Sequence, residues 1–230
     1  MNEIFVQMPL FSLVLTIGAY QIGLFFQRKW KTPLCNPLLI AVALVVGVLL
    51  LTGCSVETYQ AQIKIFSWFI TPATVALAVP LYEQMQKLKK NLPAILAGVA
   101  AGAITGLVSV LAMCAFFALD RQTTVSLLPK SITTAIALVL SQQNGGIEAL
   151  TSLVIAFTGI FGSIAGTALC KLLKLQNPIA QGVAFGTSAH VIGTAKASEL
   201  GSVQGAVSSL SLTVAGILTA ILFPLVISLL

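Results

Sequence analysis

The sequence predicts an all-α, polytopic membrane protein with six to eight transmembrane segments, some of them broken or re-entrant. Of its 230 residues, 57% are hydrophobic and only 8% are charged, whereas soluble domains carry roughly 25% charged residues. The apolar stretches have the length of helices and lack the alternating pattern of a membrane β-barrel. We therefore expect one helical membrane domain over residues 1–230, in contact with a lipid bilayer.

The charges indicate an orientation. The net charge of +6 is thinly spread, which argues against a nucleic-acid partner and is typical of a cytoplasmic excess of lysine and arginine. The first span is predicted at Ile4–Phe26, and Arg28, Lys29 and Lys31 follow it. These cations predict a cytoplasmic end after the first span and therefore an N-terminus outside.

Further spans are expected at Leu38–Thr52, Ile63–Met85, Pro93–Leu119, Glu148–Leu173 and Gly205–Leu230. Pro72 and Pro80 should kink or interrupt the Ile63–Met85 span, because each removes a backbone donor. Lys87, Lys89 and Lys90 should form a cytoplasmic exit from that span.

Two segments do not fit a simple crossing. If Ser126–Gly146 and Asn177–Gly201 both span, the chain crosses eight times, and Lys171 and Lys174 fall outside, against the charge rule. If both segments dip in and return from opposite faces, those lysines lie inside. This second hypothesis gives an inverted repeat of the kind that secondary carriers build around a midplane site.

Glycines at helical spacing predict close helix packing. Gly98, Gly102 and Gly106 stand four residues apart, and Gly162 and Gly166 repeat this spacing in a later span. Such small-residue seams let another helix approach closely, so packing is their expected role.

A first candidate site surrounds Lys130. Pro129 is expected at the first helical position, where free N–H groups and the lysine together favour an anion. The hydroxyls of Ser131, Thr133 and Thr134 could bind the hydroxyl or carbonyl of a small hydroxy- or keto-carboxylate. The alternative is that Lys130 extends outward to the membrane interface.

A second candidate site lies in Gly186–Lys196, which contains the single histidine of the sequence. Thr187, His190 and Thr194 stand at i, i+3 and i+7, so a regular helix would place them on one face. His190 could pair with an anion or carry a coupled proton. The alternative is that it hydrogen-bonds a backbone carbonyl and only holds helices together. The predicted substrate-binding residues also include Ser188, and the flanking glycines Gly186 and Gly193 favour a helix break.

Enzymatic and metal chemistry are not expected. Cys35, Cys54, Cys114 and Cys170 form no metal-ligand spacing, and no catalytic motif is found. We therefore predict no catalytic residues, no metal and no cofactor.

Several blocks of sequence resemble the LrgB/CidB family, which includes YohK-type inner-membrane proteins. They are Pro80-Leu-Tyr-Glu-Gln, Leu88-Lys-Lys-Asn, Leu127-Leu-Pro-Lys-Ser-Ile-Thr-Thr, Asn144-Gly-Gly and Gly186-Thr-Ser-Ala-His-Val-Ile-Gly-Thr-Ala-Lys-Ala. The family pattern continues its Pro-Lys-Ser block with a proline where this chain has Ala135, so no proline kink is expected there.

The resemblance implies two functions. Bacterial members are described as antiholin-like proteins that, with a small LrgA/CidA-like membrane partner, modulate murein hydrolase activity and autolysis. The plastid glycolate/glycerate transporter is similar to an LrgA-like part fused to an LrgB-like part, and related bacterial proteins are associated with pyruvate. The first hypothesis is a monocarboxylate carrier that acts with such a partner, and the second is a non-transporting regulator. In either case we expect a homo- or hetero-oligomer.

Overall fold

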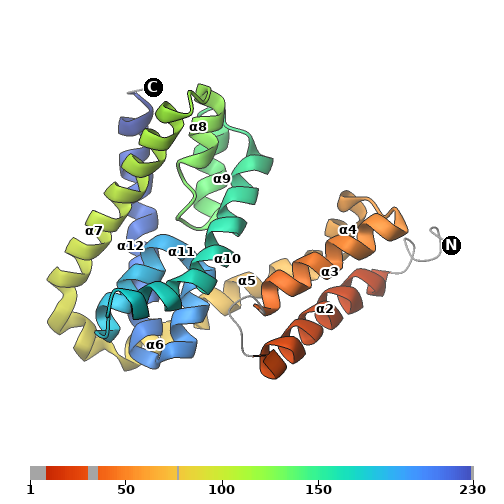
Figure 1. Ribbon diagram of the computed structural model, residues 1–230, viewed down its shortest axis with the longest axis horizontal. Coiled ribbons are helices and arrows are strands. Elements are labelled where there is room, and N and C mark those ends of the chain that lie inside the picture. Colours follow the sequence, from red (N-terminus) through yellow and green to blue (C-terminus); the bar gives the residue numbers. More distant parts are fainter. Residues whose placement is uncertain (1–8, 31–35, 77, 229–230) are drawn as a thin grey trace. The chain divides into compact units, whose positions relative to one another are not determined.

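The computed structural model describes residues 9–30, 36–76 and 78–228, and these residues form helices joined by short turns, without a β-strand (Figure 1). The chain divides into two compact units, residues 1–76 and 77–230. Within the described ranges, the helices long and apolar enough to cross a membrane are Leu10–Trp30, Met85–Phe116, Glu148–Leu172 and Ser202–Ile227. The predicted class, a helical membrane protein, is thereby supported, while six to eight crossings are not confirmed.

The first unit contains α2 (Pro9–Trp30), α3 (Pro37–Thr52), α4 (Val56–Gln62) and α5 (Lys64–Ala76). Helix α3 has strong end signals: the Asn36 side chain caps its N-terminus, and Gly53 ends it in the left-handed conformation. It matches the predicted Leu38–Thr52 segment, although it is shorter than a typical span.

The predicted Ile63–Met85 span is interrupted, as expected, but not at its prolines. The chain forms α5, then α6 (Ala78–Glu83), and then α7 (Met85–Phe116). Helix α5 continues through Pro72, and α6 contains Pro80 in its first turn, where no N–H donor is required. Helix α7 begins eight residues before Pro93, so Lys87, Lys89 and Lys90 lie on the helix and not in an exit loop.

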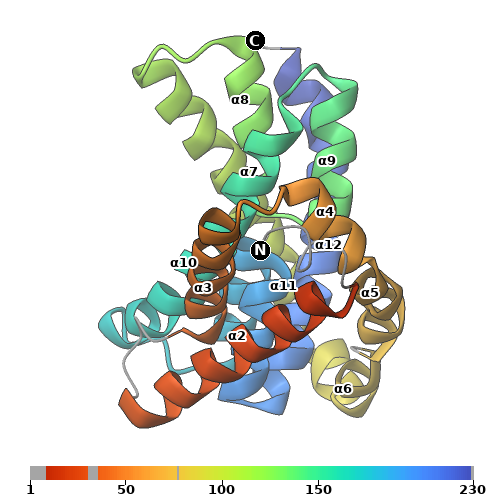
Figure 2. The same ribbon diagram turned by 90° about the vertical axis from the view of Figure 1, so that its right-hand side faces the viewer.

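The second unit is built on the long helices α7, α10 (Glu148–Leu172) and α12 (Ser202–Ile227). Between α7 and α10 lies a first hairpin, formed by α8 (Arg121–Leu127), a turn at residues 128–133, and α9 (Thr134–Gln143) (Figures 1 and 2). Ser126 anchors it to α10, because its Oγ accepts from the Ile147 N–H at 2.7 Å and its carbonyl accepts from Thr151 Oγ1 at 3.1 Å.

The second hairpin is α11 (Pro178–Leu200), which begins with Asn177 as its N-cap. Its backbone leaves helical geometry at Ala189 (φ −128°, ψ 17°) and His190 (φ 42°, ψ −135°). A Cβ added to Gly193 would lie 2.6 Å from the Phe185 carbonyl oxygen, eight residues earlier, so the chain folds back at the break.

Contacts with α12 confirm the reversal. In the first half of α11, Gly182 lies against Val207 and Gly186 against Ser211, so the two segments run in the same direction. In the second half, Thr194 pairs with Ser208 and Ser198 lies against Gly205, so the order is reversed. The halves of α11 therefore pack on the same part of α12 in opposite directions.

The hairpins enter the second unit from opposite ends. The first half of α11 runs parallel to α7, because Val183 lies at Gly98 and Thr187 at Gly102. The same half runs antiparallel to α10, because Phe185 lies at Gly166 and Ala189 at Gly162. Helices α7 and α10 are therefore antiparallel. The first hairpin follows the C-terminal end of α7, and the second follows the C-terminal end of α10. The segments predicted to dip both double back, and their position in a bilayer stays a prediction.

Candidate functional site

The glycine seam of α7 receives both hairpins. A Cβ added to Gly102 would lie 3.1 Å from Thr187 Oγ1, and one added to Gly106 would lie 3.9 Å from Ser131 Oγ. Thr187 comes from the second hairpin and Ser131 from the turn of the first. Residues of the same chain thus fill the seam. Because glycine has no side chain, the two hairpins can approach the middle of α7 closely.

A small void lies where the hairpins meet. Side chains from both hairpins line it, together with residues of α7 and α12: Gly106, Ser131, Thr187, Ala215 and Thr219. Its volume is about 10 Å³. That is roughly the space of one water molecule, so the void is too small for a carboxylate in this conformation.

Pro129 does not begin a helix, which corrects the prediction. It lies in the turn of the first hairpin, where the Lys130 N–H donates to the Leu127 carbonyl at 3.2 Å. Helix α9 begins at Thr134 with Thr133 as its N-cap, and no side-chain cap bond is formed there. The free N–H groups of the helix start therefore lie five residues further along the chain.

Lys130 is half-buried and stands four residues before this helix start. Its Nζ lies 3.3 Å from Ser131 Oγ, and it forms no ion pair with a described carboxylate. Burial without a counter-ion is costly for a lysine, and an anion contact of Lys130 stays a prediction. Thr133 is half-buried and Thr134 is exposed.

Thr187, His190 and Thr194 do not share one face, because the helix is broken between the first and the last. Thr187 faces α7 and the void, and its hydroxyl donates to the Val183 carbonyl at 2.7 Å. Thr194 faces α12, where its hydroxyl pairs with Ser208 Oγ at 2.8 Å. Ser188 is exposed and donates to the Ala184 carbonyl at 2.6 Å.

His190 contacts α10. Its Nε2 lies 2.9 Å from the Ile155 carbonyl oxygen, and only 4% of the residue is exposed. A Cβ at Gly159 would come within 2.6 Å of the imidazole, so this glycine makes room for the ring. This is the geometry of the packing alternative, and a substrate contact of His190 stays a prediction.

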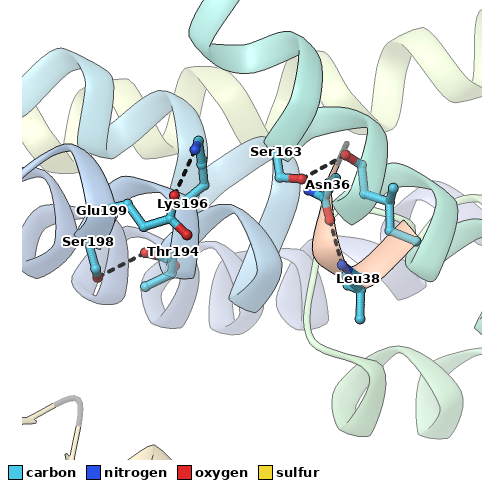
Figure 3. Close-up of polar contacts among 8 residues, drawn as sticks. Asn36, Leu38, Ser163, Thr194, Lys196, Ser198 and Glu199 are labelled. Carbon is cyan, nitrogen blue, oxygen red and sulfur yellow. Dashed lines mark hydrogen bonds and ion pairs between the residues drawn. The ribbon is translucent and has the colours of Figure 1, made fainter. Parts of the chain in front are cut away.

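The predicted glycines flank the break but do not form it. Gly186 packs against Ser211, and Gly193 packs against Ala189 and Phe185. In both places a side chain would collide, so the glycines permit close approach of the hairpin halves. Beyond the break, Lys196 pairs with Glu199 at 2.7 Å on the surface, and Ser198 Oγ donates to the Thr194 carbonyl at 3.0 Å (Figure 3).

Residues that sequence reasoning missed include Thr219 and Ser208, both buried on α12. Small residues at positions 208, 211, 215 and 219 form one helical stripe, and this spacing is the signal that could have found them. Gly159 was missed because its partner, His190, is 31 residues away. Among the described residues, no group of His, Cys, Asp and Glu is arranged to hold a metal ion.

These features define a multi-pass helical membrane protein with opposed hairpins that meet in its interior. The chain belongs to the LrgB-like family, which it matches over residues 16–229. It is 37% identical to the antiholin-like protein LrgB of Bacillus mycoides, over 94% of this chain and 95% of that protein. Proteins of the same name from Bacillus cereus and Bacillus anthracis are 36% identical over the same shares. No solved structure matches the chain.

Proposed function

We propose that this protein is a carrier or facilitator of small monocarboxylates, such as pyruvate or glycolate, that acts with an LrgA/CidA-like partner. The observation that carries this proposal is Lys130, a half-buried cation without a carboxylate partner among the described residues. It stands four residues before the uncapped start of α9. The carboxylate would bind the lysine and the free N–H groups of that helix, as anions do at helix N-termini.

The opposed hairpins supply a route to the site from each side. Each enters from a different end of the α7–α10–α12 frame, and both reach the glycine seam at Gly102 and Gly106. Inverted units of this kind form midplane sites in secondary carriers. Because the void holds about one water molecule, the hairpins must separate to admit a substrate. Separation on one side at a time would give alternating access.

The hairpins are then re-entrant segments of one membrane domain in the bacterial inner membrane. The basic residues support the orientation: because α7 and α10 are antiparallel, Lys87 to Lys90 lie at the same end of the unit as Lys171 and Lys174. A cytoplasmic location of that end satisfies the positive-inside rule.

A second candidate is an antiholin-like, non-transporting regulator of murein hydrolase activity. Its support is the name of the relatives, antiholin-like protein LrgB. The glycine seams no longer support it as partner surfaces, because the hairpins occupy them. Metabolite flux could itself alter autolysis, so the two functions are compatible.

The test is uptake of labelled pyruvate, glycolate and lactate into proteoliposomes, with and without an LrgA-like partner. Lys130→Ala should abolish uptake without loss of folded protein. The matched control is Lys90→Ala, which removes an exposed lysine from α7 and should transport normally. Uptake by Lys130→Ala equal to that of the wild type would refute the proposed site. No uptake by the wild type with its partner, but altered autolysis in cells, would favour the regulator.

A further inference from the structure

A second, larger cleft opens at the base of the α11 hairpin, away from the void. It lies between the C-terminal end of α10, the start of α11 and the start of α12, and its volume is about 480 Å³. Its polar lining consists of Thr167, Lys171, Lys174, Gln176, Gln181 and Gln204. A cleft of this size can hold a small-molecule head group.

The lining of this cleft suits an anion. Lys171 and Lys174 form no ion pair with another described residue, and no carboxylate lines the cleft. The Thr167 Oγ1 atom is buried and has no hydrogen-bond partner in the described part of the chain. These donors, with the amides around them, match the oxygen atoms of a phosphate or carboxylate.

The cleft continues into an apolar trough along the seam between α10 and α11, which Figure 2 shows side by side. The trough has a volume of about 180 Å³, and Gly166, Leu169, Phe185 and Ser188 line it. Cys170 and Leu175 line both the cleft and the trough, so the two are contiguous. The cleft, with Lys171 and Lys174, forms the basic mouth of this groove. Leu172 and Leu173 beside it are more than 70% exposed, as on a lipid-facing surface.

We propose that this continuous groove binds one anionic phospholipid, with its phosphate at Lys171 and Lys174 and an acyl chain in the trough. A soluble anion would use the mouth and leave the trough empty, whereas a phospholipid fills both. Basic pockets between helices at the cytoplasmic face recognise acidic head groups in this way.

The bound lipid would stabilise the position of the α11 hairpin. Gln181 near the start of α11 accepts from Gln204 Nε2 near the start of α12 at 3.2 Å, and the Gln181 Nε2 donates to the Leu175 carbonyl at 2.7 Å. A phosphate beside these amides joins the three segments at the base. Anionic lipid is therefore expected to hold the hairpin against α10.

The experiment is a titration of delipidated protein in neutral detergent, with binding followed by native mass spectrometry and thermal stability. Phosphatidylglycerol should bind, and phosphatidylcholine with the same acyl chains should bind much more weakly. The double variant Lys171→Gln/Lys174→Gln should weaken phosphatidylglycerol binding roughly 30-fold. The matched control, Lys89→Gln/Lys90→Gln, removes two exposed lysines from α7 and should bind as the wild type.

Two further arms identify the ligand. Glycerol phosphate, which lacks acyl chains, should not stabilise the protein, and Ala184→Leu, which fills part of the trough, should weaken lipid binding. Stabilisation by glycerol phosphate equal to that by the lipid would overturn the proposal in favour of a soluble anion. If both double variants lose phosphatidylglycerol binding equally, the binding depends on surface charge in general and not on this groove. Lys130→Ala should bind lipid normally, so this test does not depend on transport.

Discussion

His190 Nε2 lies 2.9 Å from the backbone carbonyl oxygen of Ile155, which joins the break of the α11 hairpin to the middle of α10. The residue adopts φ 42°, a conformation that is uncommon outside glycine, so the fold holds it in place. The histidine is thus a structural contact at the point where the chain reverses.

Replacing this histidine should reduce stability. His190→Ala removes a buried hydrogen bond and leaves a cavity, with an expected loss of roughly 2–3 kcal/mol in the free energy of unfolding. His190→Gln retains a donor and should lose less. Thermal unfolding in detergent measures both variants. A wild-type melting temperature for His190→Ala, together with lost uptake, would instead support a direct role in transport.

The close packing of Gly159 against His190 gives a second prediction. Gly159→Ala places a methyl group 2.6 Å from the imidazole and should destabilise the protein by about 1–3 kcal/mol. In the double variant Gly159→Ala/His190→Ala the clash with the imidazole is gone, and only Ile192 Cδ1, at 2.8 Å, remains close to the added methyl group. The loss of the double variant should therefore be smaller than the sum of the single losses.

The control for this cycle is Gly47→Ala in α3, where an added Cβ meets nothing within 4 Å. Alanine there should be neutral or should stabilise the helix by about 0.5–1 kcal/mol. If Gly159→Ala melts like Gly47→Ala, the close contact between α10 and His190 does not exist.

Thr194 and Ser208 should be energetically coupled. Their hydroxyl oxygens are 2.8 Å apart in a buried position between the second half of α11 and α12. Hydrogen bonds between membrane helices contribute about 0.6 kcal/mol on average, with a maximum near 1.7. A double-mutant cycle of Thr194→Val and Ser208→Ala should give a coupling within that range. Strict additivity would indicate that the hairpin does not return along α12.

The first hairpin should respond to acid through Asp120, the N-cap of α8. Its carboxylate accepts from the Thr123 hydroxyl at 2.6 Å and from the Thr123 N–H at 3.1 Å. These hydrogen bonds lower the pKa of Asp120 below its ordinary value of 3.8. Because the folded-state pKa is depressed, the stabilisation is present above pH 3.8 and is lost as the pH falls through the folded value.

Hydrogen exchange measures this effect at the amides of α8. Their protection should be constant between pH 5 and 8, after correction for intrinsic exchange, and should decrease below about pH 3.8. Asp120→Asn keeps a capping side chain without a titrating group, so its protection should not change with acid. An identical acid response in this variant would assign the effect to another residue.

The sequence predicted several helix ends well, because their signals are local. The predicted Leu38–Thr52 segment ends where α3 ends, because Gly53 adopts the left-handed conformation. The predicted segment that begins at Asn177 matches the start of α11, because the Asn177 side chain caps this helix. Proline was a weaker guide, because a membrane helix can continue through Pro72 when its surroundings satisfy the freed carbonyl.

Composition and motifs by themselves determined that the chain is a helical membrane protein of the LrgB/CidB type, with glycine seams and polar segments at Lys130 and His190. The tertiary structure decided which residues contact the glycine seams and the segments at Lys130 and His190. Periodicity assumes a continuous helix, and the break at Ala189 and His190 turned Thr187 toward α7 and His190 toward α10. The partners of the seams lie far away in sequence, and contacts between distant segments are chosen by packing, which local pattern does not encode.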